Sequence, residues 1–300
     1  MKILIAGGSG FLGKALAAQL TEQNHEVVIL SRRCGSLRES CVNWGSLDEL
    51  FLSNLDGVIN LAGENIASGR WTMRKKAAIA ASRVETTQTI VRLMRRAYDE
   101  YGRQPKWLIN ASAIGYYGTD LEKTFDESDS YSRDFLAEVC RKWEGIALQA
   151  EEIGVRVVVL RFGHILASDG GFLARMEQPF RYHVGGYIGS GRQWVSWIHR
   201  NDLVAMVLTA LEDDSWYGVY NACAPEPVRM AEMSELIGLA LGRKSWTRLP
   251  EWILRLLFGE LAEDVLLKGQ RVLPVRAQKN GFIFRFPKLS DALAFIHKSK

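Results

Sequence analysis

A glycine-rich turn near the N-terminus constrains the fold of this chain more than any other feature of its sequence. Residues 7–13 read Gly-Gly-Ser-Gly-Phe-Leu-Gly and directly follow Lys2–Ala6, an apolar run with the length of a buried strand. The next segment, residues 11–23, has the apolar spacing of a helix. A strand, a glycine turn and a helix in this order indicate the first βαβ unit of a sheet that binds a dinucleotide.

The glycines of this turn have a physical role in such a site. Glycine permits the tight turn, and the missing side chain lets a pyrophosphate approach the amides at the helix N-terminus, where the helix dipole favours an anion. The alternative interpretation is a tight turn without a ligand. The position of the motif, directly between a strand and a helix, favours the dinucleotide.

The first half of the chain alternates short apolar runs with longer segments of helical period. This pattern predicts an α/β protein of the Rossmann type, with a doubly wound parallel sheet covered by helices on both faces. The expected strands are Lys2–Ala6, Glu26–Leu30, Gly57–Asn60, 107–111 and 156–160, with a possible sixth at 219–223. The expected helices are 11–23, 73–97, 135–152 and a segment near 201–211.

The pattern of the sequence changes after residue 160, where glycine-rich loops become frequent. Such loops usually build a substrate region over a cofactor site. We expect a main domain over residues 1–246, with 166–200 contributing to the substrate region, and a smaller C-terminal domain over 247–297. Within the latter, helices are expected near 252–258, 265–267 and 291–298.

The end of the second expected strand carries Ser31, Arg32 and Arg33. A site that prefers NAD usually has an Asp or Glu here to bind the adenosine ribose. A guanidinium binds a phosphate instead, and a serine hydroxyl adds a donor, so this segment suits the 2′-phosphate of NADP. The alternative is a pair of surface arginines on a loop.

Composition excludes several other classes of function. The chain has 300 residues and a formal net charge of only +4, and its basic groups are short and mixed with acidic residues, which disfavours nucleic-acid binding. Its four cysteines lie far apart, so we expect free thiols, no metal site and no disulfide. The apolar run at the N-terminus is too short for a secretion signal or a membrane span, so we expect a soluble, cytoplasmic protein.

Several longer strings resemble those of a known family. They are GGSGFLG at 7–13, SRR at 31–33, NLAGENI at 60–66, SAIGYYG at 112–118, KWE at 142–144 and GSGRQWVSWIH at 189–199. With them the chain resembles the extended short-chain dehydrogenase/reductase superfamily and, within it, the epimerase-family branch (YfcH-like) that carries a C-terminal domain of unknown function. The resemblance covers the chain from the glycine turn to this C-terminal unit.

The resemblance implies a set of NADP(H) contacts. They fall on Gly7, Gly10, Phe11, Leu12, Ser31, Arg32, Leu61, Ala62, Arg83 and Ile165. We add Gly13, which closes the glycine turn, and Gly63, which follows the strand at 57–60 where the backbone must pass close to the cofactor. From its spacing alone, Arg83 is more often a surface residue of its helix.

The superfamily also implies a catalytic serine, tyrosine and lysine, in which the lysine follows the tyrosine by four positions and lowers its pKa. Ser112, just past its expected strand, fits the serine, and Lys142 on the next helix fits the lysine. However, residue 138 is a glutamate, and no tyrosine of the chain has a lysine four residues later. Tyr116 or Tyr117 is therefore the candidate proton donor, with packing of the loop as the alternative. Glu138 could act as an acid if it were desolvated, but an exposed position on its helix is favoured.

We also assign expected roles to four further residues. His199 and Asp202 are interpreted as capping a helix and bracing a loop rather than as catalytic. Arg192 can reach an anionic group of a substrate. His164 either donates to a substrate or cofactor or is a buried, hydrogen-bonded histidine.

These observations predict an NADP(H)-binding protein. We expect an oxidoreductase or epimerase-like enzyme that acts on an unidentified carbonyl, hydroxyl or sugar-nucleotide substrate. The alternative, motivated by the missing tyrosine, is a non-catalytic NADP(H)-binding regulator or scaffold. We expect a small-molecule partner, no nucleic acid and no membrane, and either a monomer or a homodimer.

Overall fold

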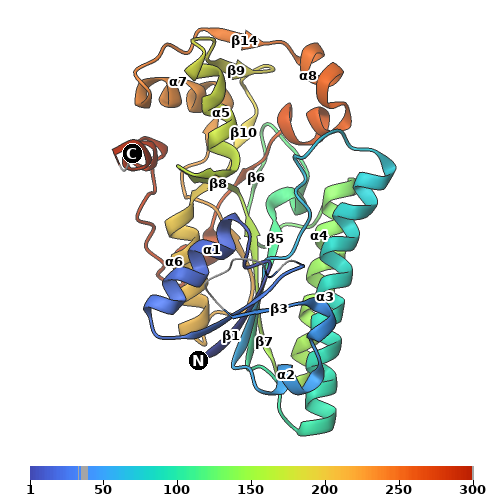
Figure 1. The fold of residues 1–300 in the computed structure, drawn as a ribbon. Helices are drawn as coiled ribbons and strands as arrows, with labels where there is room; N and C mark the ends of the chain where they lie inside the picture. The colour runs from blue at the N-terminus through green and yellow to red at the C-terminus, as the bar shows by residue number, and fades with distance from the viewer. Residues whose placement is uncertain (33, 35–39, 299–300) are drawn as a thin grey trace.

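A parallel sheet of seven strands forms the centre of the molecule (Figure 1). The computed structural model describes residues 1–32, 34 and 40–298. The strands of the sheet are β1 (Lys2–Ala6), β2 (Glu26–Leu30), β3 (Ser40–Val42), β4 (Gly57–Asn60), β5 (Trp107–Ala113), β7 (Arg156–Phe162) and β12 (Gly218–Ala222). Their order is β12-β7-β5-β4-β1-β2-β3, and every pairing is parallel. The predicted doubly wound α/β fold is confirmed, with its switch point between β1 and β4.

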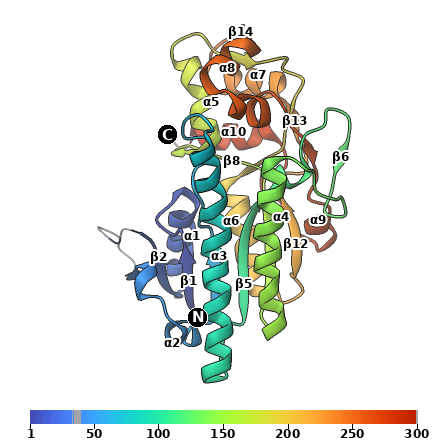
Figure 2. The ribbon, with the colours of Figure 1, turned by 90° about the vertical axis from the view of Figure 1, so that its right-hand side faces the viewer.

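Helices cover both faces of the sheet, as Figures 1 and 2 show. On one face, α1 (Phe11–Glu22) and α6 (Arg200–Glu212) pack their leucines and valines against β1, β2 and β7. On the other face, α2 (Glu49–Ser53), α3 (Met73–Tyr101) and α4 (Phe135–Leu148) cover the alternate side chains of the same strands. The strands are buried on both faces, which is why they appear in the sequence as continuous apolar runs.

The structure differs from the sequence-based elements in several places, and three of these differences lie near the glycine turn or Ser112 or on α4. β3 was not expected, because Ser40–Val42 is short and lacks an apolar run. β5 continues to Ala113, so Ser112 lies inside the strand and not just past it. The expected helix 135–152 is α4 followed by the 3-10 helix η3 (Gln149–Ile153), which ends at Gly154 with φ +78°.

Smaller strand pairs build a region above the carboxyl ends of the sheet. β8 (His164–Ala167) pairs in parallel with β11 (Trp197–His199). β10 (Trp194–Val195) pairs in the antiparallel direction with β13 (Val228–Arg229). β9 (Gly186–Ile188) pairs with β14 (Thr247–Leu249), and β6 (Thr124–Phe125) pairs with β15 (Arg271–Val272). In the last two pairs, a strand after residue 246 joins one from earlier in the chain, so the C-terminal segment is tied to the rest by backbone hydrogen bonds.

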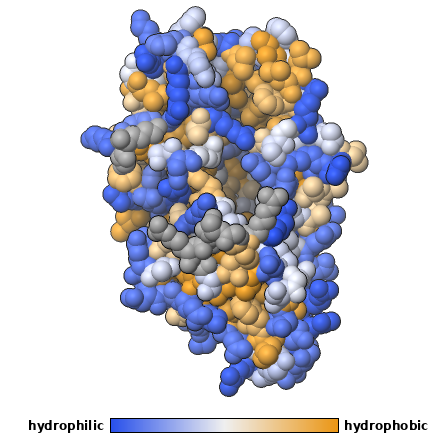
Figure 3. Space-filling model, viewed as in Figure 1, coloured by the Kyte–Doolittle hydropathy of each residue, from blue (hydrophilic) through white to orange (hydrophobic). Residues whose placement is uncertain are grey.

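Three helices, α5 (Gly171–Arg181), α7 (Met230–Ala240) and α10 (Leu289–Lys298), pack around an apolar cluster of this upper region. α8 (Glu251–Phe258) and the π-helix η4 (Ala262–Leu266) contribute to a smaller cluster around Trp71, and α9 (Val275–Lys279) packs Ala277 against the core on the α1 side of the sheet. The outer side of α8 exposes Trp252, Leu256 and Leu257, and an apolar area is visible at the upper right of Figure 3. No helix in the described part of the chain has the length and apolar character needed to cross a membrane.

Candidate cofactor and active site

The glycine turn forms a cradle between β1 and α1 that leaves no room for side chains. Gly7 has φ +79°, and a Cβ there would lie 3.0 Å from the carbonyl of Leu61. A Cβ on Gly13 would lie 2.5 Å from the Cα of Gly8. Helix α1 begins at Phe11 with Gly10 as its N-cap, and no side chain caps it. Its first amides are therefore left for an anion, which fits the pyrophosphate of a dinucleotide.

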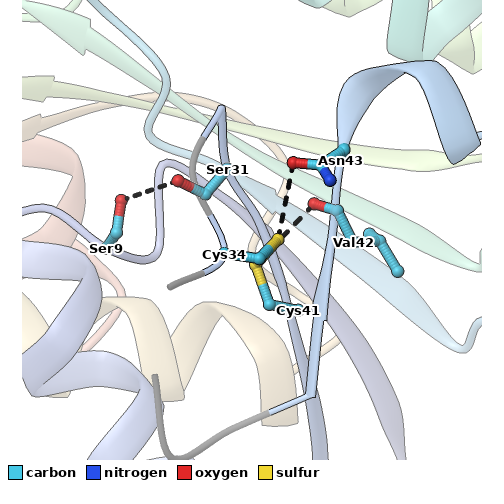
Figure 4. The surroundings of a disulfide bond; sticks show 6 residues. All are labelled: Ser9, Ser31, Cys34, Cys41, Val42 and Asn43. Carbon is cyan, nitrogen blue, oxygen red and sulfur yellow. Dashed lines mark hydrogen bonds between the residues drawn. A yellow bond between two sulfur atoms is a disulfide. The ribbon is translucent and has the colours of Figure 1, made fainter. Parts of the chain in front are cut away.

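The segment after β2 lies beside this turn. The hydroxyls of Ser9 and Ser31 are 3.1 Å apart, which brings the turn and the end of β2 together (Figure 4). Arg32 is exposed. The hydrogen bond and charge of Lys75 lower the pKa of Glu64, and the charge of Arg32 acts in the same direction. Arg33, which the sequence analysis grouped with these residues, lies outside the described residues.

A disulfide joins Cys34 to Cys41 in this region, with a Cα–Cα distance of 5.5 Å (Figure 4). The expectation of four free thiols was therefore wrong for this pair. The reason is the unexpected strand β3: its pairing with β2 brings the chain back beside the residues that follow Leu30. The expectation is confirmed for Cys140 and Cys223, which are free and buried.

Arg83 projects from α3 toward the loop that follows β4. Its Nη1 donates to the carbonyls of Glu64 and Ile79, at 3.1 and 3.0 Å, and its guanidinium faces the ring of Trp143. The carbon of the guanidinium would lie 3.1 Å from a Cβ on Gly63. Burial lowers the pKa of Arg83. The structure thus places Arg83 inward, beside Gly63, where it can meet a bound phosphate.

A pocket with a cavity volume of about 360 Å³ opens above the carboxyl ends of β4, β5 and β7. Figure 3 shows this face hollowed between the C-terminal helices and the sheet. The C-terminal segment closes the pocket with Asp264, Val265, Lys268 and Gln270. Of the predicted site residues, the pocket wall contains Leu61, Gly63, Arg83 and Ser112. Ligands of open α/β sheets bind at this edge.

Ser112 lines the pocket and forms a hydrogen bond with a buried carboxylate. Its hydroxyl donates to Oε1 of Glu144, on α4, at 2.5 Å. Glu144 in turn accepts two hydrogen bonds from the guanidinium of Arg161, at 2.9 and 2.8 Å. Burial alone would lower the pKa of Arg161, but the hydrogen bonds and charge of Glu144 raise it well above its usual value.

The two candidate tyrosines pack against Arg161. Tyr117 is buried, and its hydroxyl accepts from Nη1 of Arg161 and donates to Oδ1 of Asn221, at 2.8 Å each. Burial raises the pKa of Tyr117 far above its ordinary value. The ring of Tyr116 lies against the guanidinium of Arg161, 3.3 Å from its carbon. Neither tyrosine is among the residues that line the pocket.

The structure does not bring Lys142 to Ser112. Lys142 is exposed on the outer side of α4, and Glu138 forms a surface ion pair with Arg141. The residues of α4 that face Ser112 are Cys140 and Glu144, which are four positions apart. Neither residue was predicted from the sequence. A usable signal existed, because the apolar face of this helix includes Cys140 and Trp143 and puts Glu144 among buried residues.

The remaining candidate residues differ in whether they line the pocket. His164 lines the pocket wall and packs on Phe172, and burial lowers its pKa to about 4. Ile165 follows it in β8 and packs against the core between the sheet and α1. Arg192 is exposed and lies 3.9 Å from Glu122, outside the residues that line the pocket.

His199 and Asp202 are structural, as expected. His199 is the N-cap of α6 and accepts from the amide of Asn201. Asp202 accepts from the amides of Arg285 and Phe286, which anchors the segment before α10. Within the described residues, no group of three His, Cys, Asp or Glu side chains is arranged to hold a metal ion.

His199 provides a test of this scaffold by pH. Burial, helped by the charges of Arg200 and Arg285, lowers its pKa to about 4 from 6.5. Between these pH values the unfolded chain binds a proton that the folded chain does not, so the free energy of unfolding decreases as the pH falls. We expect His199→Asn, which keeps a capping acceptor, to reduce this slope by up to about 1.4 kcal/mol per pH unit in urea unfolding at pH 5–6.5. An unchanged slope would contradict the assignment.

Comparison with known proteins agrees with this geometry. Residues 3–223 match the model of the NAD dependent epimerase/dehydratase family, and residues 249–296 match a domain of unknown function, DUF1731. The chain belongs to the NAD dependent epimerase/dehydratase family. The resemblance drawn from the sequence strings is thereby confirmed.

Relatives of this epimerase-family protein match it along nearly its whole length. It is 40% identical to the chloroplastic homolog of epimerase family protein SDR39U1 from Arabidopsis thaliana, over 99% of this chain and 86% of the relative. It is also 40% identical to epimerase family protein YfhF from Bacillus subtilis, over 98% and 97% of the two chains. Among solved structures, human SDR39U1 (isoform 2) with NADPH is similar with a TM-score of 0.87 and 33% identity, covering 100% of both chains.

Proposed function

We propose that this epimerase-family protein is an NADP(H)-dependent oxidoreductase or epimerase-like enzyme. The observation that carries the proposal is the pocket at the carboxyl edge of the sheet, whose wall contains Ser112 and also Leu61, the residue whose backbone lies beside Gly7 of the glycine turn. The similar human structure was solved with NADPH, which supports the choice of cofactor. When bound, NADP(H) supplies the acceptor or donor of a hydride.

Different residues of the chain bind different parts of this cofactor. The amides at the start of α1 bind the pyrophosphate, and Gly7, Gly13 and Gly63 allow the backbone to approach it. Arg83 adds a positive charge from α3. Ser31 and Arg32 bind the 2′-phosphate, which only NADP(H) carries.

The choice of NADP(H) over NAD(H) has a direct test. Arg32→Ala should weaken NADPH binding by about tenfold, because a hydrogen bond to a charged group contributes about 1.5–3 kcal/mol and this site is exposed. NADH binding should change by less than about twofold, since NADH has no 2′-phosphate. Calorimetric titration of both nucleotides measures this. Equal losses for the two would show that Arg32 does not select the cofactor.

Catalysis itself is tested with NADPH and a panel of carbonyl compounds and sugar nucleotides. We expect oxidation of NADPH with at least one member of the panel. The second candidate function is an NADP(H)-binding regulator, which is favoured by the absence of any tyrosine with a lysine four residues later in the sequence. Tight NADPH binding without turnover of any member, together with a partner recovered only in the presence of NADPH, would favour the regulator.

We further propose that the partner of the protein is a small molecule rather than a nucleic acid or a membrane, and that the protein works in the cytoplasm as a monomer or a homodimer. The volume and enclosure of the pocket support a small-molecule ligand. Size-exclusion chromatography of the NADPH-loaded protein measures the oligomeric state.

A further inference from the structure

The hydrogen bond between Ser112 and Glu144 has a fixed direction. A serine hydroxyl has one proton to donate, whereas a carboxylate only accepts. At 2.5 Å, the proton of Ser112 is therefore committed to Oε1 of Glu144. Both side chains are buried, with exposed fractions of 2% and 4%, so water does not compete for this bond. What Ser112 presents to the pocket is its lone pairs.

Glu144 is held in place for this role by the group behind it. Arg161 donates to both carboxylate oxygens of Glu144 and is itself fixed by the hydroxyl of Tyr117. This bidentate pairing keeps the carboxylate oriented toward Ser112. Ser112 reaches the pocket wall, whereas Glu144 is not among the residues that line it. Among the described residues that line the pocket, Ser112 is the one that is hydrogen-bonded to Glu144, so a proton from the pocket reaches Glu144 through Ser112.

We propose that Ser112 and Glu144 form a proton relay that recognises the hydroxyl group of a small, largely apolar alcohol. The proposal rests on the proposed function and deepens it by naming the substrate class. In the oxidation, the carbon of the alcohol gives up its hydrogen with the bonding electron pair to oxidised NADP, and the C–O bond becomes a carbonyl. The hydroxyl proton passes to Oγ of Ser112, whose own proton passes to Oε1 of Glu144. Reduction of the carbonyl runs through the same atoms in reverse.

Other groups near Ser112 are less suited to this proton transfer. The thiol of Cys140 donates weakly to the carbonyl of Ala113, at 3.7 Å, and burial raises its pKa to about 11, so it keeps its proton. The hydroxyl of Tyr117 is engaged by Arg161 and Asn221 away from the pocket. Lys142 faces solvent. Ser112 is the hydroxyl at the pocket floor that is joined to a base.

The pocket wall determines the rest of the substrate class. About half of the residues that line it are aliphatic or aromatic, among them Ile66, Ile79, Leu136, Val139, Phe162 and Val265, and four charged residues also line it, Arg83, Asp134, Asp264 and Lys268. Its volume of about 360 Å³ is near the lower end of the range of about 300–1,000 Å³ for ligand sites, and the nicotinamide must share it. A small apolar alcohol fits this space beside the nicotinamide better than a sugar nucleotide does.

The direction of the hydrogen bond can be tested without turnover. Matched pairs such as cyclohexanol with cyclohexanone and 2-octanol with 2-octanone differ only in whether the oxygen carries a proton. We expect the NADP⁺-loaded protein to bind the alcohol of a pair about tenfold more tightly than the ketone, because only the alcohol donates to Ser112. Ser112→Ala should abolish this preference with unchanged NADP⁺ affinity, and Ser112→Thr, which keeps a hydroxyl, should retain it.

A second variant weakens the base. Glu144→Gln removes the negative charge that accepts from Ser112 and Arg161 and leaves a single amide oxygen as acceptor, so the proton of Ser112 is held less firmly and the preference for the alcohol should decrease. If this variant does not fold, the serine variants decide the test alone. Equal binding within every pair, a ketone preference of the native protein, or no binding of any alcohol would overturn the relay. An alcohol preference without NADPH formation from any alcohol would support recognition by Ser112 while contradicting the proposed enzymatic function.

Discussion

Glu144→Ala is expected to lower the free energy of unfolding by about 3–5 kcal/mol, because it leaves the guanidinium of Arg161 buried without its partner. Native proteins of this kind have a total stability of about 5–15 kcal/mol, so the variant should be only marginally folded. The hydroxyl of Ser112 would lose its acceptor in the same step. Urea unfolding followed by circular dichroism measures the effect.

A matched control lies on the same helix. Glu138 also pairs with an arginine, but that pair is on the surface, with both side chains more than a third exposed. Exposed pairs contribute about 0–1 kcal/mol, so Glu138→Ala should change the stability little. If Glu144→Ala costs no more than Glu138→Ala, the buried pair does not hold the site together as described.

Gly13→Ala is expected to weaken NADPH binding by about 100-fold, equivalent to about 2.7 kcal/mol. A Cβ at this position would lie 2.5–2.7 Å from backbone atoms of Gly7 and Gly8, so the turn that receives the pyrophosphate would have to move. The shift acts on the amides themselves, which no side chain can replace. Fluorescence titration of NADPH measures the loss.

Gly145 provides the control for this variant. It lies within α4, and a Cβ there would meet nothing within 4 Å. Gly145→Ala should therefore leave NADPH affinity unchanged and raise the stability by about 0.5–1 kcal/mol, because alanine favours the helix. Native-like NADPH affinity in Gly13→Ala would show that the turn does not hold the cofactor.

The sequence was sufficient to predict six of the seven strands of the sheet because parallel strands are buried on both faces. β1, β2 and β4 are apolar runs bounded by loops, and their predicted limits agree with the structure. β3 has no such run, since it lies at the edge of the sheet and contains Ser40 and Cys41. The disulfide between Cys34 and Cys41 depends on this strand, so it could not be inferred from the cysteine spacing.

The active site was only partly predictable for a different reason. Ser112 was found because it stands at the carboxyl end of a strand, where sites of this fold lie. The residues opposite it depend on the rotation of α4, which puts Cys140 and Glu144 toward the strand and Lys142 toward solvent. The superfamily pattern pointed to Lys142, but the apolar face of α4 would have pointed to Glu144. Its partner Arg161 comes from β7, and only the folded chain shows that pairing.

Hydride transfer is tested most directly by following a deuterium label from NADPH. The protein is incubated with NADPH deuterated at the nicotinamide C4, on either face, and with a panel of small apolar ketones and aldehydes. We expect one face of the cofactor to deliver deuterium to the carbonyl carbon of at least one compound, and we expect Ser112→Ala to abolish this transfer while NADPH still binds. Tight binding of NADPH with no deuterium in any product, for either label, would contradict the function proposed for this site.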